Sequence, residues 1–355
     1  MIPQKHRGSL AAALLVPALI FSACTAEADD GGSATSTSAD APAADTTVSG
    51  KIAVSGSSTV EPITALVAEE FMAQNDKVDI TVDGPGTGDG FELFCNGETD
   101  ISDASRPIKE AEAATCASKG IEFIELKVGI DGLSVITAED NPLKCLSYQD
   151  LYALVGPESE GFDRWGDAQA LAKELGSATQ FPDENLVVTA PGAESGTFDS
   201  FVELVIEKAG EARVEAGAIS EDDVAAARDD YSASPDDNAI IEGVASDPGG
   251  LGWVGFAFAD QAEGVKLMPV TAEPGGDCVA PSAATIQDGS YPISRPLFIY
   301  VNKAKAEKNK GLAAFVDFYL DGLTGFVEAA DYIALEDDAA TAAAWKARTV
   351  GSHQG

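Results

Sequence analysis

The sequence predicts an α/β protein of two lobes that are joined by two chain crossings. Short apolar strands alternate with helical segments from residue 51 to residue 126, which is typical of an α/β domain with a largely parallel sheet. Two further apolar stretches, Val128–Thr137 and Pro296–Val301, are predicted to cross between the lobes, with a second α/β set between them. Two lobes with two crossings form a clamshell that closes around a ligand by hinge motion.

The first lobe is predicted to begin with a strand, KIAVSG, at Lys51. A helix follows over Val60–Asn75, because its apolar residues recur on one helical face. The next expected elements, in order, are a strand VDITV, a short helix Phe91–Asn96, a short strand Asp100–Ser102, a helix Ile108–Lys119 and a strand IEFIEL.

The second lobe is predicted to contain helices near Ser147–Val155 and Ala168–Leu175, and a strand Leu186–Thr189 before a helix at Ser195. After the second crossing, helices Leu312–Leu323 and Leu323–Tyr332 return to the first lobe. We therefore assign residues 51–131 and 292–355 to lobe 1 and residues 132–291 to lobe 2.

Residues 1–23 are typical of a secretory signal. Lys5 and Arg7 precede an apolar run from Leu10 to Phe21 that is too short to span a bilayer comfortably. Ser22 and Ala23 then lead to Cys24, which resembles the lipidation site of bacterial lipoproteins; ordinary cleavage beside an incidental cysteine is the alternative. Residues 24–50 are rich in Ser, Thr, Ala, Asp and Gly, which predicts a flexible tether. The sequence thus predicts an exported protein, lipid-anchored at the outer face of the bacterial cytoplasmic membrane.

The charge and the histidine content exclude several classes of function. Lys and Arg number 22 against 59 Asp and Glu, giving a net charge of −37 that argues against nucleic acid as a partner. The two histidines are His6, in the predicted signal, and His353, near the C-terminus. A catalytic Ser/His or Cys/His pair, or a zinc site containing histidine, therefore has no imidazole in the predicted folded body.

Four cysteines besides Cys24 are predicted to form two disulfides, since the count is even and the chain is predicted to be exported. Three pairings are open. We favour Cys95–Cys116 and Cys145–Cys278, because each pair then lies within one predicted lobe. A metal site is not expected, as no close C-x-x-C spacing occurs.

Three Gly/Ser/Thr clusters are the strongest signal of chemistry. Each of Gly56–Thr59, Gly86–Gly88 and Ser195–Thr197 follows a short apolar stretch and opens a predicted helical segment. The N-terminus of a helix carries unpaired N–H groups and about half a positive charge, so it can hold an oxyanion without a metal. A single cluster is explained by helix capping alone. Three that converge predict an anion site that is complete only when the clamshell is closed.

Six stretches resemble the substrate-binding protein of the phosphate ABC transporter (PstS type), which has a type II periplasmic-binding-protein fold. They lie in the same order along residues 51–303: GSSTVEPI, GTGDGF, ETDISDASRPI, ESGTFDSF, DYSASPDDN and CVAPSAATIQDGSYPISRPLFIYVN. The resemblance implies that the protein binds inorganic phosphate and delivers it to membrane permease subunits. It implies no enzymatic activity, no cofactor and no metal, and we expect a monomer.

The phosphate ligands are expected to be hydroxyls, backbone N–H groups and fixed cations. From the clusters and the resemblance we assign Ser58, Thr59, Thr87, Gly88, Ser105, Ser195, Gly196 and Thr197. Arg106 is expected to take two phosphate oxygens in a planar fork, with a surface ion pair as its alternative. Family members often carry another arginine where this chain has Pro191, and we expect Arg228 to replace it.

A carboxylate is also expected in the site, since phosphate keeps a proton at neutral pH whereas sulfate does not. Asp103 is the first choice of acceptor, ahead of Asp131 and Asp89. The alternatives for the whole protein are the same fold binding sulfate, arsenate or molybdate, or an extracellular phosphatase with Ser195 as its nucleophile.

Overall fold

A computed structural model describes residues 48–193 and 195–351. The predicted signal peptide, the lipidation site Cys24 and all but the last residues of the predicted tether lie outside the described residues. Within the described part, no helix is both long enough and apolar enough to cross a membrane.

One mixed sheet runs through both lobes. Its strands follow the order β2-β1-β3-β11-β4-β8-β6-β7, and β9 pairs with β4. These strands are β1 (Gly50–Gly56), β2 (Val78–Asp83), β3 (Ile101–Ala104), β4 (Phe123–Ala138), β6 (Val187–Ala190), β7 (Ser232–Ala233), β8 (Gly250–Gly255), β9 (Val265–Leu267) and β11 (Ser294–Asn302). The short strands β5 (Leu146–Ser147) and β10 (Val270–Thr271) form a separate pair.

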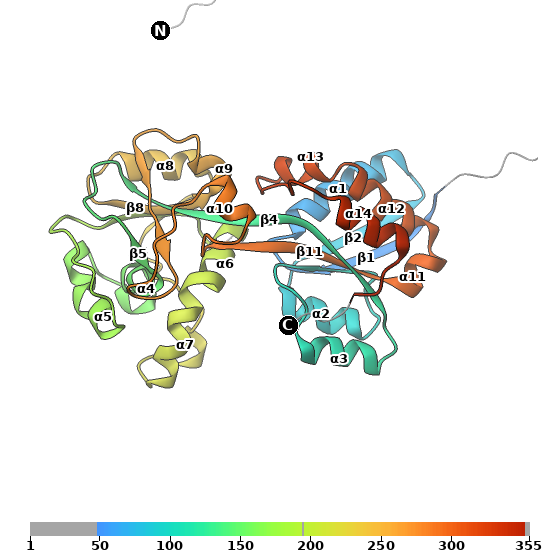
Figure 1. Ribbon diagram of the computed structural model, residues 1–355, viewed down its shortest axis with the longest axis horizontal. Helices are drawn as coiled ribbons and strands as arrows, with labels where there is room; N and C mark the ends of the chain where they lie inside the picture. Colours follow the sequence, from blue (N-terminus) through green and yellow to red (C-terminus); the bar gives the residue numbers. More distant parts are fainter. Residues whose placement is uncertain (1–47, 194, 352–355) are drawn as a thin grey trace, which may run out of the picture. The chain divides into compact units, whose positions relative to one another are not determined.

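The two crossings are β4 and β11, which extend between the two groups of helices (Figure 1). Residues Phe123–Gly132 of β4 pair with β11, and Leu133–Thr137 pair with β8. Both crossing strands are buried along almost their whole length, which explains their continuous apolar sequence. The strand IEFIEL and the crossing Val128–Thr137 were expected separately, and the structure joins them in one strand.

The sheet is less parallel than its βαβα pattern indicates. β1 pairs in parallel with β2 and β3, and β6 pairs in parallel with β7 and β8. The pairs that β4 and β11 make with β3, β8 and each other are antiparallel. The reason is that one crossing leaves the first lobe and the other returns to it.

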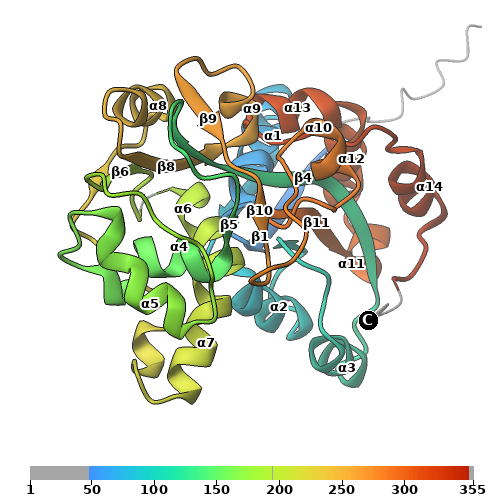
Figure 2. The same ribbon diagram turned by 60° about the vertical axis from the view of Figure 1, so that its left-hand side comes forward.

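The first lobe encloses a core of side chains from residues 52–128 and 297–345. Its N-terminal and C-terminal helices pack together, as the contact between α1 and α12 shows (Figures 1 and 2). The rings of Phe71 and Phe315 meet edge to face in this core. The helices are α1 (Glu61–Gln74), α2 (Thr87–Cys95), α3 (Glu110–Ser118), α11 (Lys303–Lys308), α12 (Lys310–Asp321), α13 (Leu323–Ala329) and α14 (Ala339–Ala347).

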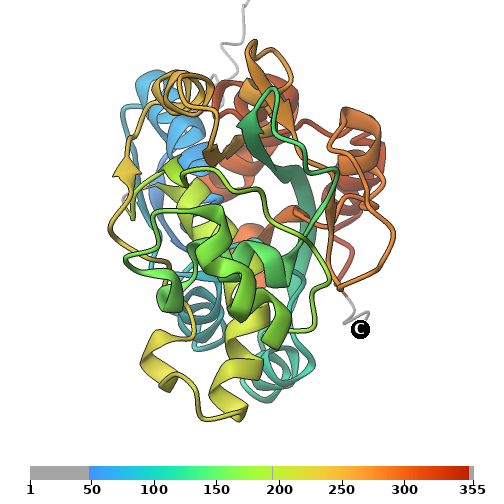
Figure 3. The ribbon, with the colours of Figure 1, turned by 90° about the vertical axis from the view of Figure 1, so that its left-hand side faces the viewer.

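The second lobe encloses a core of side chains from residues 130–293. Phe201 and Trp253 stack there with ring centroids 4.2 Å apart, and α4 packs against α7 (green and yellow, Figure 3). The helices are α4 (Tyr148–Val155), α5 (Gln169–Glu174), α6 (Gly196–Phe201), α7 (Glu207–Glu215), α8 (Asp237–Ala245), α9 (Phe256–Ala259) and α10 (Ala283–Gln287), with 3-10 turns at Pro157–Ser159, Trp165–Ala168 and Glu221–Asp223 and a π-helical turn at Val202–Ile206.

The first-lobe core lies within our predicted residues 51–131 and 292–355, whereas the second-lobe core extends past 132–291 to include Ile130 and Ile293. The division into lobes remains our own proposal. The disulfides are Cys95–Cys116 and Cys145–Cys278, the two pairs that we favoured from the sequence. Cys95–Cys116 joins the end of α2 to α3, so it ties together two helices of the first lobe.

Candidate functional site

Two of the Gly/Ser/Thr clusters lie side by side in the first lobe. The Ser57 N–H donates to the carbonyl of Asp103 at 2.9 Å, and the Gly86 N–H donates to the carbonyl of Gly56 at 2.9 Å. Gly90 lets α2 pack closely against Gly56 at the end of β1, because a Cβ atom on residue 90 would lie 2.4 Å from the Gly56 Cα. Gly86 has φ +115°, a conformation that favours glycine. These contacts hold the first two clusters together.

The third cluster, from the second lobe, meets the first. Ser195 caps α6 by accepting a hydrogen bond from the Thr197 N–H at 3.2 Å. Gly196 faces Ser58 and Thr59, since a Cβ on Gly196 would lie 3.5 Å from the Ser58 carbonyl oxygen. The structure therefore brings all three clusters to the same region of the molecule.

Hydroxyl groups connect the two lobes at this junction. The Ser58 hydroxyl donates to Asp199 Oδ2 at 2.8 Å, and the Thr59 and Ser200 hydroxyls lie 3.2 Å apart. Thr59 and Ser200 are buried. Each of these contacts joins the loop before α1 to α6.

Arg295, at the start of β11, is the cation at the centre of this junction. Its Nη2 donates to the hydroxyls of Thr59 at 2.9 Å and Ser200 at 2.7 Å, one from each lobe. Its Nε donates to Asp131 Oδ2 at 3.3 Å, and its Nη1 forms an ion pair with Glu203. The residue is 9% exposed, so its charge lies largely out of water.

The two carboxylates next to Arg295 keep its guanidinium ionised. Burial raises the pKa of Asp131, and the guanidinium of Arg295 opposes that shift. Burial lowers the pKa of Arg295, but the charges of Asp131 and Glu203 outweigh it and keep the pKa above its usual value. Arg295 therefore stays charged, and a fixed buried cation at this junction can bind an anion.

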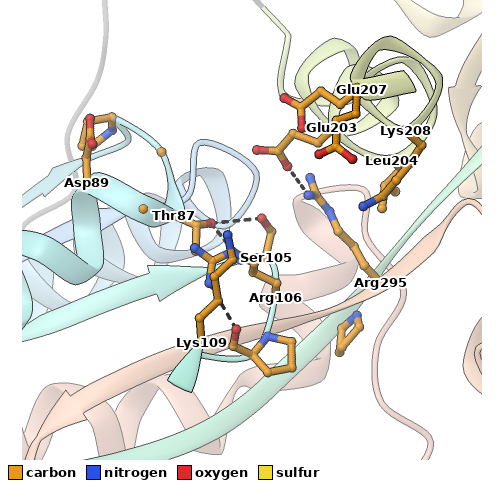
Figure 4. Close-up of a pocket in the computed structure, with 16 residues that line it drawn as sticks. Thr87, Asp89, Ser105, Arg106, Lys109, Glu203, Leu204, Glu207, Lys208 and Arg295 are labelled. Carbon is orange, nitrogen blue, oxygen red and sulfur yellow. Dashed lines mark hydrogen bonds and ion pairs between the residues drawn. The ribbon is translucent and has the colours of Figure 1, made fainter. Parts of the chain in front are cut away.

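A cavity of about 560 Å³ opens beside Arg295 between the two lobes (Figure 4). In the first lobe, the Thr87 and Ser105 hydroxyls lie 3.1 Å apart and both line it, as does Gly88. The complete lining is Pro85, Gly86, Thr87, Gly88, Asp89, Ser105, Arg106, Pro107, Lys109, Glu203, Leu204, Glu207, Lys208, Glu211, Arg295 and Pro296. Hydroxyls, backbone groups and cations thus share one cavity with carboxylates.

Arg106 lines the cavity and is held within the first lobe. Its guanidinium makes a two-point ion pair with Glu112, at 2.9 and 2.7 Å, and lies 5.5 Å from the centre of the Phe91 ring. Burial raises the pKa of Glu112, yet the hydrogen bonds and charge of Arg106 hold it below its usual value. The planar fork expected from the sequence is therefore made with a carboxylate of the protein.

Other predicted ligands lie outside the cavity lining. Arg228 is buried in the second lobe, where it pairs with Asp230 at 2.5 Å and donates to the carbonyl of Phe162. Pro191, at the position of the family's arginine, accepts a hydrogen bond from the Tyr231 hydroxyl at 2.6 Å. The cavity is not lined by Ser58, Thr59, Ser195, Gly196 or Thr197, which lie at the lobe junction described above.

Asp103 is buried at the base of the first cluster and does not line the cavity. The pKa of Asp103 is raised to about 7: burial is the main cause, the charge of Glu61 adds to it, and the nearby Thr64 side chain opposes it. The Thr64 hydroxyl in turn lies 3.2 Å from that of Tyr319 on α12. Of the other two carboxylates considered as acceptors, Asp131 contacts Arg295 and Asp89 lines the cavity.

The sequence reasoning missed Arg295, Ser200 and Glu203. Arg295 lies within the stretch SYPISRPLFIYVN, directly before the second predicted crossing, and an arginine next to a hinge strand was an available signal. Ser200 and Glu203 follow the third cluster by one helical turn or more. Their roles depend on the junction between the lobes, which local patterns do not specify.

The chain is similar to known proteins over most of its length. Residues 41–322 match the model of a PBP superfamily domain. The protein SphX of Synechococcus elongatus is 36% identical over 300 residues, which cover 84% of this chain and 81% of that protein. The phosphate-binding protein PstS of Staphylococcus saprophyticus is 32% identical over 287 residues, which cover 81% of each chain.

A solved structure agrees with these relatives. The crystal structure of a protein from Planctomyces limnophilus, described as a possible phosphate binding protein, has 35% identity and a TM-score of 0.74, and the match covers 85% of this chain and 99% of that one. The PstS structure from Borrelia burgdorferi, at 20% identity and a TM-score of 0.56, shares the fold. The resemblance stated from the sequence is confirmed, and the chain belongs to the PBP superfamily.

Proposed function

We propose that this protein is an extracytoplasmic receptor that binds inorganic phosphate and delivers it to the permease of an ABC importer. One observation carries the proposal: the buried Arg295 guanidinium lines the interlobe cavity and contacts hydroxyls of both lobes. A tetrahedral oxyanion needs a fixed cation and several hydrogen-bond donors, and closing the lobes would bring both.

The relatives support phosphate as the ligand. The Staphylococcus saprophyticus relative is named a phosphate-binding protein, and the Planctomyces limnophilus structure carries a similar description. In our proposal the anion lies in the cavity, close to Thr87, Ser105, Arg106 and Arg295. We propose Ser58, Thr59 and the Ser195–Thr197 cluster, which meet at the lobe junction beside Arg295, as further donors.

The setting of the protein is also part of the proposal. We infer that Cys24 is lipidated after removal of residues 1–23, and that residues 24–50 tether a monomeric receptor to the outer face of the cytoplasmic membrane. We further infer that the receptor has no catalytic activity. A chromogenic phosphate ester tests the last point, since its hydrolysis would favour the phosphatase alternative.

Calorimetric titration with phosphate and sulfate tests the proposed ligand. Phosphate is expected to bind tightly and sulfate far more weakly, whereas equal affinities would remove the phosphate assignment. Arsenate and molybdate titrations extend the comparison to other tetrahedral oxyanions.

The third cluster has its own test. Ser195→Ala is expected to weaken phosphate binding by roughly 1 to 3 kcal/mol, the value of a hydrogen bond to a charged group. Ser118→Ala, an exposed serine at the end of α3, is the matched control. If both variants bind phosphate as the parent does, the third cluster does not contact the ligand.

A further inference from the structure

The contacts of Arg295 differ in how easily a ligand could replace them. A guanidinium has five N–H groups, and four hydrogen bonds join that of Arg295 to Asp131, Glu203, Thr59 and Ser200. The Asp131 side chain is 3% exposed and that of Glu203 is 42% exposed. Thr59 and Ser200 are buried. Removing a buried partner leaves an unsatisfied polar group, which costs free energy. The Glu203 side chain, in contrast, can rotate toward solvent, where water hydrogen-bonds its carboxylate.

Glu203 also occupies the position that an incoming anion needs. It belongs to the π-helical turn between α6 and α7, and its carboxylate reaches the Nη1 of Arg295 from the wall of the cavity (Figure 4). Glu203 therefore neutralises the cation on its cavity side. An oxyanion that approaches Arg295 through the cavity meets this carboxylate first.

The neighbouring charges favour the departure of Glu203 once an anion is present. Glu207 and Glu211 line the same cavity one and two turns further along the chain. Burial and the charges of Glu203 and Glu211 raise the pKa of Glu207, so the carboxylates already repel one another. An anion on Arg295 would add to this repulsion unless Glu203 moved away.

We propose that Glu203 is an internal competitor of the ligand, which holds the Arg295 guanidinium in the absence of an oxyanion and leaves it when the oxyanion binds. This inference rests on the proposed phosphate-binding function. Glu203 thus lowers the affinity for every anion that binds Arg295.

The test is calorimetric titration of inorganic phosphate into the parent protein, Glu203→Gln and Glu211→Gln. Loss of the competing carboxylate is expected to tighten phosphate binding roughly tenfold, since the competing contact is a hydrogen bond between charged groups. Glu211→Gln removes the same charge from the same cavity without freeing Arg295, because among the described residues the Glu211 carboxylate makes no hydrogen bond or ion pair with Arg295. Its gain is expected to be no more than about threefold, as for a charge that acts through solvent.

Equal gains in Glu203→Gln and Glu211→Gln, or weaker binding in Glu203→Gln, would overturn the inference. Glu203→Ala is the second variant, in case the amide keeps a hydrogen bond to the guanidinium, and melting temperatures establish that each variant is folded. A parent protein that binds no phosphate would instead refute the proposed function.

Discussion

Arg295 and Arg106 are two arginines in the wall of one cavity, and their surroundings differ. The Arg106 side chain is 30% exposed, and its partners Glu112 and Phe91 both belong to the first lobe. Arg295 is 9% exposed and contacts Thr59 in the first lobe and Ser200 and Glu203 in the second. Arg106 can therefore keep its contacts whether the lobes are open or closed. The contacts of Arg295 depend on how the lobes meet.

Because Arg106 is held by one lobe and Arg295 by both, we expect the two cations to act at different stages of binding. A side chain held entirely by one lobe can receive an anion before closure, since its geometry is already fixed. A side chain shared between the lobes links binding to the closure itself. On this view Arg106 belongs to the first encounter with the ligand, and Arg295 belongs to the closed state.

Removal of Arg295 is expected to have the largest effect. Arg295→Ala leaves the Asp131 carboxylate buried without its cation, and the loss of one partner from a buried ion pair costs about 3 to 5 kcal/mol. We expect that loss in the free energy of unfolding by chemical denaturation. We also expect phosphate binding to fall below detection by calorimetry.

The control for Arg295→Ala is Arg164→Ala, which removes an exposed ion pair with Asp183. That change is expected to leave the unfolding free energy almost unchanged, because exposed ion pairs contribute little to stability. If the two substitutions cost the same, Arg295 does not act as a buried bridge. Full phosphate affinity in Arg295→Ala would show that the ligand does not depend on it.

The buried carboxylate of Asp103 is expected to make the stability of the protein depend on pH. Burial raises the pKa of Asp103 to about 7 from the 3.8 of an unfolded chain. Between these values the folded state binds more protons than the unfolded state, so this group makes stability fall as pH rises from about 4 to about 7. Above pH 7 this loss of stability is complete. The rise of the Asp103 pKa from 3.8 to about 7 limits the loss to roughly 4 kcal/mol.

Asp103→Asn is expected to remove this slope. The variant should gain stability relative to the parent as pH rises from 4 to 8, measured as the difference between their unfolding free energies at each pH. A difference that does not change with pH would show that Asp103 ionises at its ordinary pKa. Asp131→Asn is the comparison variant. Arg295 opposes the raised pKa of Asp131, and removing the Asp131 charge leaves the buried Arg295 guanidinium without this partner.

The smallest expected effect comes from Arg106. Arg106→Ala is expected to weaken phosphate binding by about 1 to 3 kcal/mol, as for a lost hydrogen bond to a charged group. Its effect on unfolding should stay below about 1 kcal/mol, since the pair with Glu112 is partly exposed. Arg106→Lys keeps the charge without the planar fork and should bind phosphate with intermediate affinity. Unchanged affinity in Arg106→Ala would leave Arg295 as the cation that the ligand uses.

Much of the fold was predictable because it depends on local patterns. The helix predicted over Val60–Asn75 is α1, Glu61–Gln74, and the crossing predicted at Pro296–Val301 lies within β11. The helix predicted to begin at Phe91 begins earlier, at Thr87, because the Gly-rich cluster itself forms the first turn of α2. Periodicity does not mark a turn that carries few apolar residues.

The candidate site was predictable only in part. The three clusters were found because Gly, Ser and Thr at the start of a helix have a local physical reason. Arg228 was expected near the ligand, and the structure instead places it beside Asp230 and the Phe162 carbonyl, outside the cavity lining. The sequence offers 22 basic residues and gives no rule for which of them the folded chain buries between its lobes.

Sequence patterns were enough to predict the alternation of strands and helices, the two crossings and the three helix N-termini. All of these depend on residues that are close in the chain or on apolar patterning. Only the tertiary structure decided that Arg295 meets Thr59, Ser200 and Glu203. Contacts between residues 95 and 236 positions apart follow from how two lobes pack along β4 and β11, which no local pattern encodes.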